Sequence, residues 1–479
     1  MQSNRISCAH LLVTTLSVCA AAALPLHAQR SFLTASARAE VMRAVSATIG
    51  AVPAGAAARR RVMSDDLRRV YGDGEWTMLW SHDGVPTAPA RAMITAISRL
   101  HQRGLAPESF GIDSLRALAA TSTGNSARAI AFDTSMTIAS LHLLRTLRHG
   151  ETGGAQLAPR TVTLRDTMDV FRDLATLTSI STPDVLLDAA EPSHPQYRML
   201  KTALTQYRVL APADSLARSR VAQIELTMER WRWMPRGEER AAVIVNIPEF
   251  RLYAYRIDST GARDSLSMDV VVGHAGASHT PIFSDSIRYL EFAPFWNVPK
   301  SVVHSELLPI ARRDPYLLKT NHYEIVDQRG RLLPMTAASV RLLESGRAWI
   351  RQLPGGTNAL GKVKFMFPNE FDVYLHDTPV QRDFLATRRD ASHGCIRVAD
   401  PEALARLLLR DQSQWTTKTV SAAMNASAPQ RVTLTQPVPV HLMYATAVAR
   451  DDGSVAFFAD IYNLNAALAA QLAVAAAAP

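Results

Sequence analysis

The apolar pattern of this 479-residue chain changes once, near residue 240. Before that point, apolar side chains recur every three or four residues, which is the period of an amphipathic helix. After it, short β-branched and aromatic runs alternate with polar residues, as strands do. A run of helices followed by a run of strands predicts an α+β chain, with a helical N-terminal domain and a mainly β, sandwich-like C-terminal domain.

The clearest helical segments lie in the first half of the chain. They are expected over residues 90–100, 136–147 and 197–210. Gly104 follows the first segment and Gly150 the second, and glycine is common just beyond a helix end. Asp133 or Thr134 is the expected N-cap of the second helix, because a short polar side chain there accepts a hydrogen bond from the first turn.

The second half of the chain is a series of short strands with one interruption. Strands are expected over residues 242–247, 251–255, 268–272, 363–367, 373–376, 432–434 and 455–461. Residues 300–352 are mixed and more polar, and we interpret them as an insertion that acts as a lid beside a site. The expected division is a signal peptide at 1–28, a helical domain at 36–225, a β domain at 226–465 with the lid at 300–352, and an alanine-rich tail at 466–479.

The first 28 residues have the three parts of a secretory signal. Arg5 supplies the positive charge, an apolar stretch follows, and Ala28 offers a small residue at the expected cut. The alternative is an uncleaved membrane anchor, which the shortness of the apolar run disfavours. We therefore expect an exported, periplasmic protein, tethered to the membrane only if the signal stays uncleaved.

The formal net charge of +9 comes mainly from scattered arginines. Their densest cluster is at residues 59–61, where the choice is between a nucleic-acid surface and a solvated helix face. For an exported protein we favour the solvated face, so no nucleic-acid partner is expected. A basic surface would also suit an anionic polymer of the cell envelope.

Cysteine use points to a reactive thiol. Cys8 and Cys19 lie within the expected signal, so cleavage leaves Cys395 alone and without an internal disulfide partner. An exported protein has little structural use for a lone thiol, which is open to oxidation and mispairing. We therefore interpret Cys395 as a nucleophile.

A nucleophilic cysteine needs a base and donors for the oxyanion. The candidates for the base are His393, which would share a face with Cys395 on an extended strand, and His376 at the end of a predicted strand. The amides of Gly394 and Cys395 could bind the oxyanion. These side chains and Asp377 are of types that can bind zinc, but no Cys-x-x-Cys or His-Glu-x-x-His pattern supports a zinc site, so no metal or cofactor is expected.

His376-Asp377-Thr378, followed by Ser392-His393-Gly394-Cys395-Ile396-Arg397, resembles the signature of L,D-transpeptidases of the YkuD type. The likeness extends to large Gram-negative members of the YcbB type, and the helical half resembles their scaffold domain. The similar segments are 229–233, 245–248, 280–281, 296–299, 352–355, 358–361 and 438–440, with weaker ones at 71, 79–80, 104–105 and 197–210. Unlike those relatives, this chain has only residues 211–228 where a peptidoglycan-binding module would lie, which is too short for a folded module.

The resemblance implies a role for each matched residue. Cys395 would attack a stem-peptide carbonyl, with His376 as base, His393 lining the site, and the Gly394 and Cys395 amides binding the oxyanion. Four further residues would bind substrate or stabilise the motif: Arg397, Ser392, Asp377 and Tyr374.

The implied activity is that of an acyltransferase that forms 3→3 cross-links in peptidoglycan through a Cys395 thioester. The implied partners are a tetrapeptide donor stem, a diaminopimelate-type amine acceptor and other cell-wall enzymes, with carbapenems as inhibitors. Two alternatives stay open from the residues: hydrolysis of the same stems, and a wall-binding scaffold with an inert motif.

Overall fold

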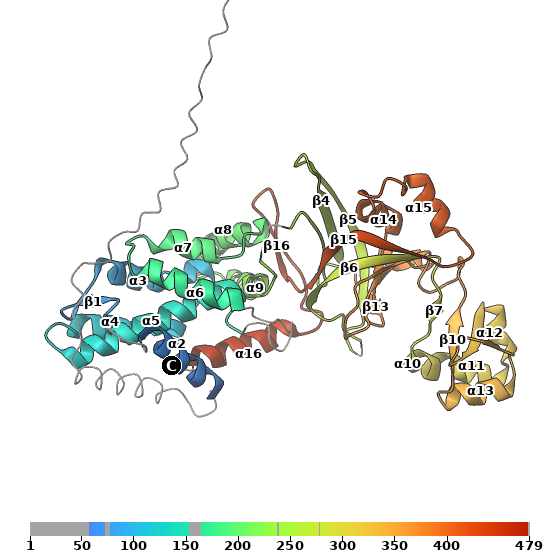
Figure 1. Ribbon diagram of the computed structural model, residues 1–479, viewed down its shortest axis with the longest axis horizontal. Coiled ribbons are helices and arrows are strands. Elements are labelled where there is room, and N and C mark those ends of the chain that lie inside the picture. Colours follow the sequence, from blue (N-terminus) through green and yellow to red (C-terminus); the bar gives the residue numbers. More distant parts are fainter. Residues whose placement is uncertain (1–56, 72–76, 153–163, 237–238, 277, 478–479) are drawn as a thin grey trace, which may run out of the picture.

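The computed structural model describes residues 57–71, 77–152, 164–236, 239–276 and 278–477. Figure 1 shows a helical domain, a central β domain and a smaller subdomain at the far end from the helices. The predicted order is confirmed: helices fill the N-terminal half and sheet dominates the C-terminal half. The signal peptide expected at 1–28, with Cys8 and Cys19, lies outside the described residues.

The helical domain buries a main apolar core between its helices, with a smaller cluster around Leu67 and Tyr71. Its elements are α2 (Ala57–Tyr71), α3 (Ala88–Ser98), η2 (Leu100–Arg103), η3 (Pro107–Phe110), α4 (Ile112–Thr121), α5 (Ser126–His149), α6 (Leu164–Leu177), α7 (Pro183–Ala190), α8 (Pro195–Leu210) and α9 (Ser215–Arg232), with a small hairpin of β1 (Ser81–His82) and β2 (Val85–Pro86). The predicted helices at 90–100, 136–147 and 197–210 correspond to α3, part of α5 and α8. Among the helices described, none is long and apolar enough to cross a membrane.

The predicted N-cap of the second helix is wrong. Helix α5 begins a full two turns earlier, where Asn125 accepts a hydrogen bond from the amide of Arg128. Asp133 lies inside the helix, and its buried carboxylate accepts bonds from the amides of Leu79, Trp80 and Ser81. Burial raises the pKa of Asp133 to about 6. A polar residue can thus occupy a helix interior when another segment supplies its donors.

The β domain is one continuous sheet that closes on itself. Its strands are β3 (Ala241–Asn246), β4 (Arg251–Ile257), β5 (Arg263–Gly273), β6 (Phe283–Phe292), β11 (Val363–Met366), β12 (Leu375–His376), β13 (Asp390–Ser392), β14 (Ile396–Val398) and β15 (Gln430–Met443). They pair in the order β13-β5-β14-β12-β11-β6-β15-β3-β4, and β4 pairs again with β5. The sandwich-like layers expected from sequence are therefore opposite sides of a closed sheet.

Alternation along the strands separates the core from the outer face. In β4, Leu252 and Ala254 are buried in the core, whereas Tyr253 and Tyr255, which alternate with them, are half-buried on the other face. Helices α14 (Pro401–Leu408) and α15 (Thr417–Met424) cover one part of the sheet, with Asp400 as N-cap of α14. This period of two places every second residue of the site strands outside the core.

The predicted insertion forms a subdomain with its own core, here called the lid. It contains α10 (Lys300–Val302), a short π-helix η4 (Val303–Leu307), α11 (Leu308–Arg313), α12 (Tyr316–Thr320), β8 (Tyr323–Asp327), β9 (Leu332–Leu333), α13 (Ala337–Glu344) and β10 (Ala348–Gln352). Strand β7 (Trp296–Asn297) pairs with β10, so the two connections to the β domain lie side by side. The apolar side chains of the lid pack on one another and form a cluster separate from the sheet core.

The chain ends with a helix that returns to the helical domain. After the hairpin of β16 (Ala447–Ala449) and β17 (Val455–Phe457), α16 (Leu464–Ala477) lies against α9 and η3 (Figure 1). Leu468 is fully buried there beside Leu226 and Trp233. The alanine-rich tail is thus a packed helix, and the expected domain boundary at 225/226 falls inside α9.

Candidate active site

Cys395 lies in a three-residue turn between β13 and β14 and is half-buried. Gly394 in that turn has φ +112°, a conformation that side chains other than glycine rarely adopt. The turn therefore requires glycine, and it ends the extended backbone just before the cysteine.

Side chains from two segments fix this turn. Buried Ser392 accepts a hydrogen bond from the amide of Gly394 at 3.2 Å and donates to the carbonyl of Cys395 at 2.5 Å. Thr280 donates to the Gly394 carbonyl at 2.8 Å and accepts from the amide of Gly273 at 2.9 Å. The motif-stabilising role predicted for Ser392 matches these contacts.

Cys395 directly precedes β14, which pairs in parallel with the strand of His376, and the two residues share a face. In the register of β12 and β14, Leu375 lies opposite Ile396 and His376 opposite Arg397. Leu375 and Ile396 point into the core, so His376 and Cys395 project from the other side. Cys395 is then the diagonal neighbour of His376 on that face.

The imidazole of His376 is held in one tautomer. Its Nδ1 lies 2.5 Å from the carbonyl oxygen of Asp377, which can only accept, so Nδ1 carries the proton and Nε2 keeps its lone pair. Burial, with a smaller effect of the nearby Arg397 guanidinium, lowers the pKa of His376 to about 4, although the bond to Asp377 opposes this shift. The ring is therefore neutral at neutral pH, with the lone pair of Nε2 free to accept a proton.

The thiol of Cys395 is also neutral in the free protein. Burial raises the pKa of Cys395, and the Asp372 carboxylate adds to the rise. The backbone amide and hydroxyl of Tyr374 act in the opposite direction, because both can donate to a thiolate. Sγ lies 3.7 Å from the carbonyl oxygen of Asp372. Tyr374 is thus placed to stabilise the thiolate once it forms.

The carboxylate of Asp377 holds a turn rather than the imidazole. It accepts bonds from the amides of Lys362 at 2.8 Å and Thr378 at 2.7 Å. Gly361, with φ +61°, passes so close that a Cβ there would lie 2.4 Å from this carboxylate. Of the two roles expected for Asp377, substrate binding or stabilisation of the motif, this contact favours stabilisation.

Arg397 pairs with the short helix that follows the histidine motif. Its Nη1 lies 2.8 Å from Oδ2 of Asp383, in η5 (Gln381–Leu385). The sequence leaves two roles open for Arg397, substrate binding and stabilisation of the motif. The ion pair with Asp383 favours stabilisation.

His393 faces the lid instead of the cysteine. Its Nε2 lies 3.5 Å from Oε1 of Glu306 in the short π-helix η4, and both side chains are exposed. The expectation that His393 and Cys395 point the same way assumed an extended strand, and the turn at Gly394 removes that premise.

The two predicted oxyanion donors differ in the resting protein. The Gly394 amide already donates to Ser392. Within the described residues, the amide of Cys395 has no recorded acceptor, so it is ready to bind a developing oxyanion. The same residues hold no group of three or more His, Cys, Asp or Glu side chains that could bind a metal.

Sequence reasoning missed several residues that shape the site. Asp372, Thr280 and Glu306 reach the motif from distant parts of the chain. Thr280 was noted only as part of a similar segment, and nothing in its local sequence signals the bond to Gly394. Such contacts depend on tertiary structure, which local patterns do not encode.

Comparisons with known proteins identify the domains that contain these residues. Residues 240–433 match the model of the L,D-transpeptidase catalytic domain, YkuD, and residues 65–204 match the model of a scaffold domain. A Haemophilus influenzae protein named "Putative L,D-transpeptidase" is 27% identical over 243 residues, or 51% of this chain and 48% of that protein. The chain thus spans about half the length of this relative. Cys395, His376 and the lid all lie within the catalytic-domain match.

Proposed function

We propose a function from one premise: the chain belongs to the L,D-transpeptidases of the YkuD type, with a scaffold domain before the catalytic domain. The proposal is that Cys395 carries the acyl group of a peptidoglycan stem as a thioester and transfers it to an amine of a second stem. The product is a 3→3 cross-link. The observation that supports it is the shared face of Cys395 and neutral His376.

In the first step, Sγ of Cys395 attacks the carbonyl carbon that joins the third stem residue to D-alanine. Nε2 of His376 takes the thiol proton, and the Cys395 amide stabilises the oxyanion. The C–N bond then breaks, and the imidazolium gives its proton to the departing amine of D-alanine. A thioester and free D-alanine result.

In the second step, the neutral side-chain amine of another stem attacks the thioester carbon. His376 takes a proton from the attacking nitrogen, the C–S bond breaks, and the imidazolium returns the proton to the sulfur. One amide bond is broken and one is made, so the exchange needs no external source of energy.

The experiment is product analysis with disaccharide-tetrapeptide stems. We expect the purified mature protein to release D-alanine and form cross-linked dimers, and Cys395→Ala to form none. Dimers from Cys395→Ala would overturn the proposal. Tripeptides without dimers would show that water is the acceptor and would assign the protein to the stem hydrolases.

The place of action belongs to the same proposal. We propose that the signal at 1–28 exports the chain to the periplasm, where peptidoglycan stems are its substrates and carbapenems acylate the same thiol. Residues 211–228 lie in α9 and the turn before it, so glycan binding would rest on the described domains themselves.

A further inference from the structure

A row of ionisable side chains, which includes the neutral His376, crosses the outer face of the sheet beside the site. Arg397 lies opposite His376, His376 opposite Lys364, and Lys364 opposite Glu291. Directly opposed residues share a face, and neighbouring strands are about 4.8 Å apart. Lys364 is therefore one strand from the base, on the side away from Cys395. Its Nζ lies 3.2 Å from Oε2 of Glu291.

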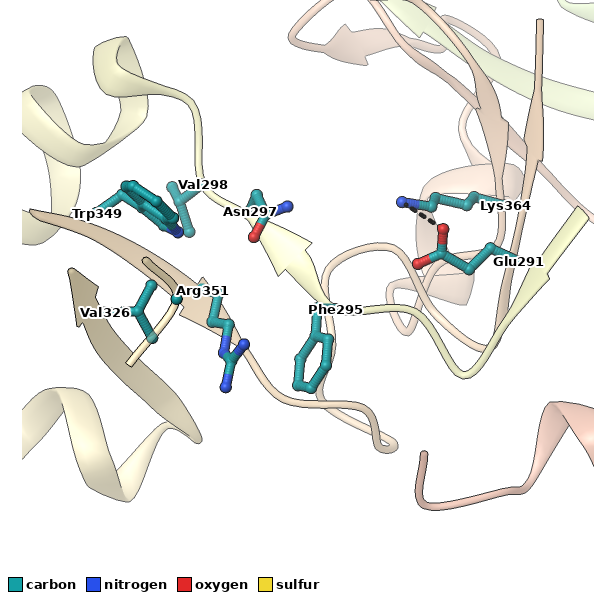
Figure 2. Close-up of a pocket in the computed structure, with 9 residues that line it drawn as sticks. Glu291, Phe295, Asn297, Val298, Val326, Trp349, Arg351 and Lys364 are labelled. Carbon is teal, nitrogen blue, oxygen red and sulfur yellow. Dashed lines mark ion pairs between the residues drawn. The ribbon is translucent and has the colours of Figure 1, made fainter. Parts of the chain in front are cut away.

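Lys364 and Glu291 line a cavity of about 540 Å³ between the sheet and the lid. Figure 2 shows the pair on one side, Trp349 on the other, and Asn297 between them. The indole of Trp349 is 37% exposed, although it stands on a strand of the lid. The volume is within the usual range for sites that bind small molecules or side chains.

The cations in the cavity wall are held in place. The side chain of Lys364 is only 15% exposed and is fixed by Glu291. On the lid side, Arg351 pairs with Glu324 and lies over the ring of Phe295, with 4.3 Å from Cζ to the ring centre. An ammonium group has three N–H donors, and Lys364 gives one to Glu291. The remaining donors suit an anion, and a carboxylate would form a strong charge-assisted bond.

We propose that this cavity binds the acceptor stem and that Lys364 binds a carboxylate on the same carbon as the attacking amine. The inference rests on the proposed function, since it assigns the acceptor of that reaction. A carboxylate held at Lys364 places the attached amine next to His376, which is the base for the transfer step. Trp349 offers an apolar face to the methylene chain that carries this head group.

This placement makes Lys364 a specificity-determining residue. A diaminopimelate side chain ends in a carbon with both an amine and a carboxylate, whereas a lysine side chain ends in an amine alone. Only the first can use Lys364, so the cavity favours diaminopimelate-type acceptors. Glu291 is a positioning residue, because it acts by orienting the Lys364 ammonium.

The test compares two acceptor tripeptides that differ only in that carboxylate, one with diaminopimelate and one with lysine. The donor is a tetrapeptide stem with its own side-chain amine acetylated, so that it cannot serve as acceptor. Acylation of Cys395 and transfer to each acceptor are measured separately by mass spectrometry. We expect the wild-type protein to prefer the diaminopimelate acceptor roughly tenfold or more in kcat/KM.

We expect Lys364→Met to remove this preference, with the loss in transfer to diaminopimelate and not in acylation. Lys364→Arg should restore part of it, and Lys418→Met, an exposed lysine on α15, should leave it unchanged. A preference that survives Lys364→Met with acylation intact would overturn the inference alone. Equal loss of acylation would also overturn it, because Lys364 would then serve the site in general. A wild-type Cys395 that is never acylated would instead overturn the proposed function beneath it.

Discussion

At the residue scale, the site combines a neutral thiol with a neutral imidazole. Burial raises the pKa of Cys395 and lowers that of His376 to about 4, so both shifts act against a preformed ion pair. In the proposed mechanism, the proton therefore moves during the attack, when the substrate carbonyl is in place. The Asp377 carbonyl keeps Nε2 of His376 ready to accept it.

The pH dependence follows from this arrangement. His376 stays neutral until the pH falls to about 4, so we expect kcat/KM for acylation to hold from pH 7 to about 5 and to drop below that. Steady-state rates with far-UV circular dichroism at each pH would check it. A loss of activity with a midpoint near pH 6.5, while the protein stays folded, would show that the pKa of His376 is not lowered.

Stability has its own pH dependence, with the sign set by the same histidine. The unfolded chain takes up a proton at His376 near pH 6.5, whereas the folded chain does so only near pH 4. Stability is therefore lost as pH falls from 6.5 to 4, by up to roughly 3 kcal/mol for this group. His194, with its pKa also lowered to about 4 by burial, acts in the same direction. Asp133, with its pKa raised to about 6 by burial, acts in the opposite direction. Unfolding of the wild-type protein and of His376→Gln in urea at pH 7 and pH 4.5 therefore isolates the contribution of His376.

At the scale of elements, the turn before β11 positions the base. Gly361 approaches the Asp377 carboxylate so closely that no side chain fits, and Asp377 in turn holds the amides of the turn. The strand that carries His376 is thus fixed by its neighbour as well as by the sheet. An added methyl group would push against Asp377 and move the base.

We expect Gly361→Ala to lower stability by about 2–4 kcal/mol and to reduce acylation well beyond the loss of folded protein. Gly346→Ala is the matched control, because Gly346 has φ +69° but open space around its Cβ position. It should cost about 1 kcal/mol from backbone strain and leave acylation unchanged. Equal effects of the two substitutions would show that the contact with Asp377 does not matter.

The lid reaches the turn that carries Cys395 through the contact of Glu306 with His393, and it faces Lys364 and Glu291 across the cavity. Arg351 lies opposite Asn297 in the pairing of β10 with β7. The two ends of the lid are therefore close enough to be joined by a short turn. Replacing residues 298–350 by Asn-Gly should raise the ratio of hydrolysis to transfer several-fold, since the thioester would be open to water and the acceptor cavity would be gone. Product mass spectrometry gives the ratio. An unchanged ratio would rule out a lid function for this subdomain.

Local sequence patterns predict many of the helices and strands, but they do not predict the tertiary contacts. The order of the domains, the strands β3 to β5, the start of α14 and the Cys395 motif could be predicted, because period, caps and motif spacing are local. Strand β6 was missed, since its first residues are mostly polar. The direction of His393 and the place of Asp133 depend on a glycine turn and on donors from a distant segment.

At the scale of the whole molecule, α16 joins the end of the chain to the helical domain. Just before it, Tyr462 donates to the Gly273 carbonyl at 2.6 Å and stacks on His279, beside the segment that holds the Cys395 turn. Leu468 then packs between Leu226 and Trp233. The last segment of the chain therefore contacts both domains.

We expect Leu468→Ala to destabilise the protein by about 2–4 kcal/mol, because it leaves a cavity in a buried contact. Val474→Ala, on the same helix but 73% exposed, should change stability by less than about 0.5 kcal/mol. Thermal unfolding followed by circular dichroism compares the two. If both have the same small effect, α16 does not contribute to the stability of the helical domain.

The central claim is that Cys395 carries the acyl group during the reaction. The most direct measurement is acid quenching of the mature protein during turnover with a tetrapeptide stem, followed by mass spectrometry of the peptide that contains Cys395. We predict a mass increase on Cys395 equal to the acyl tripeptide stem, which disappears when an acceptor amine is added and dimers form. Cross-linked product with Cys395 unmodified throughout would contradict the account.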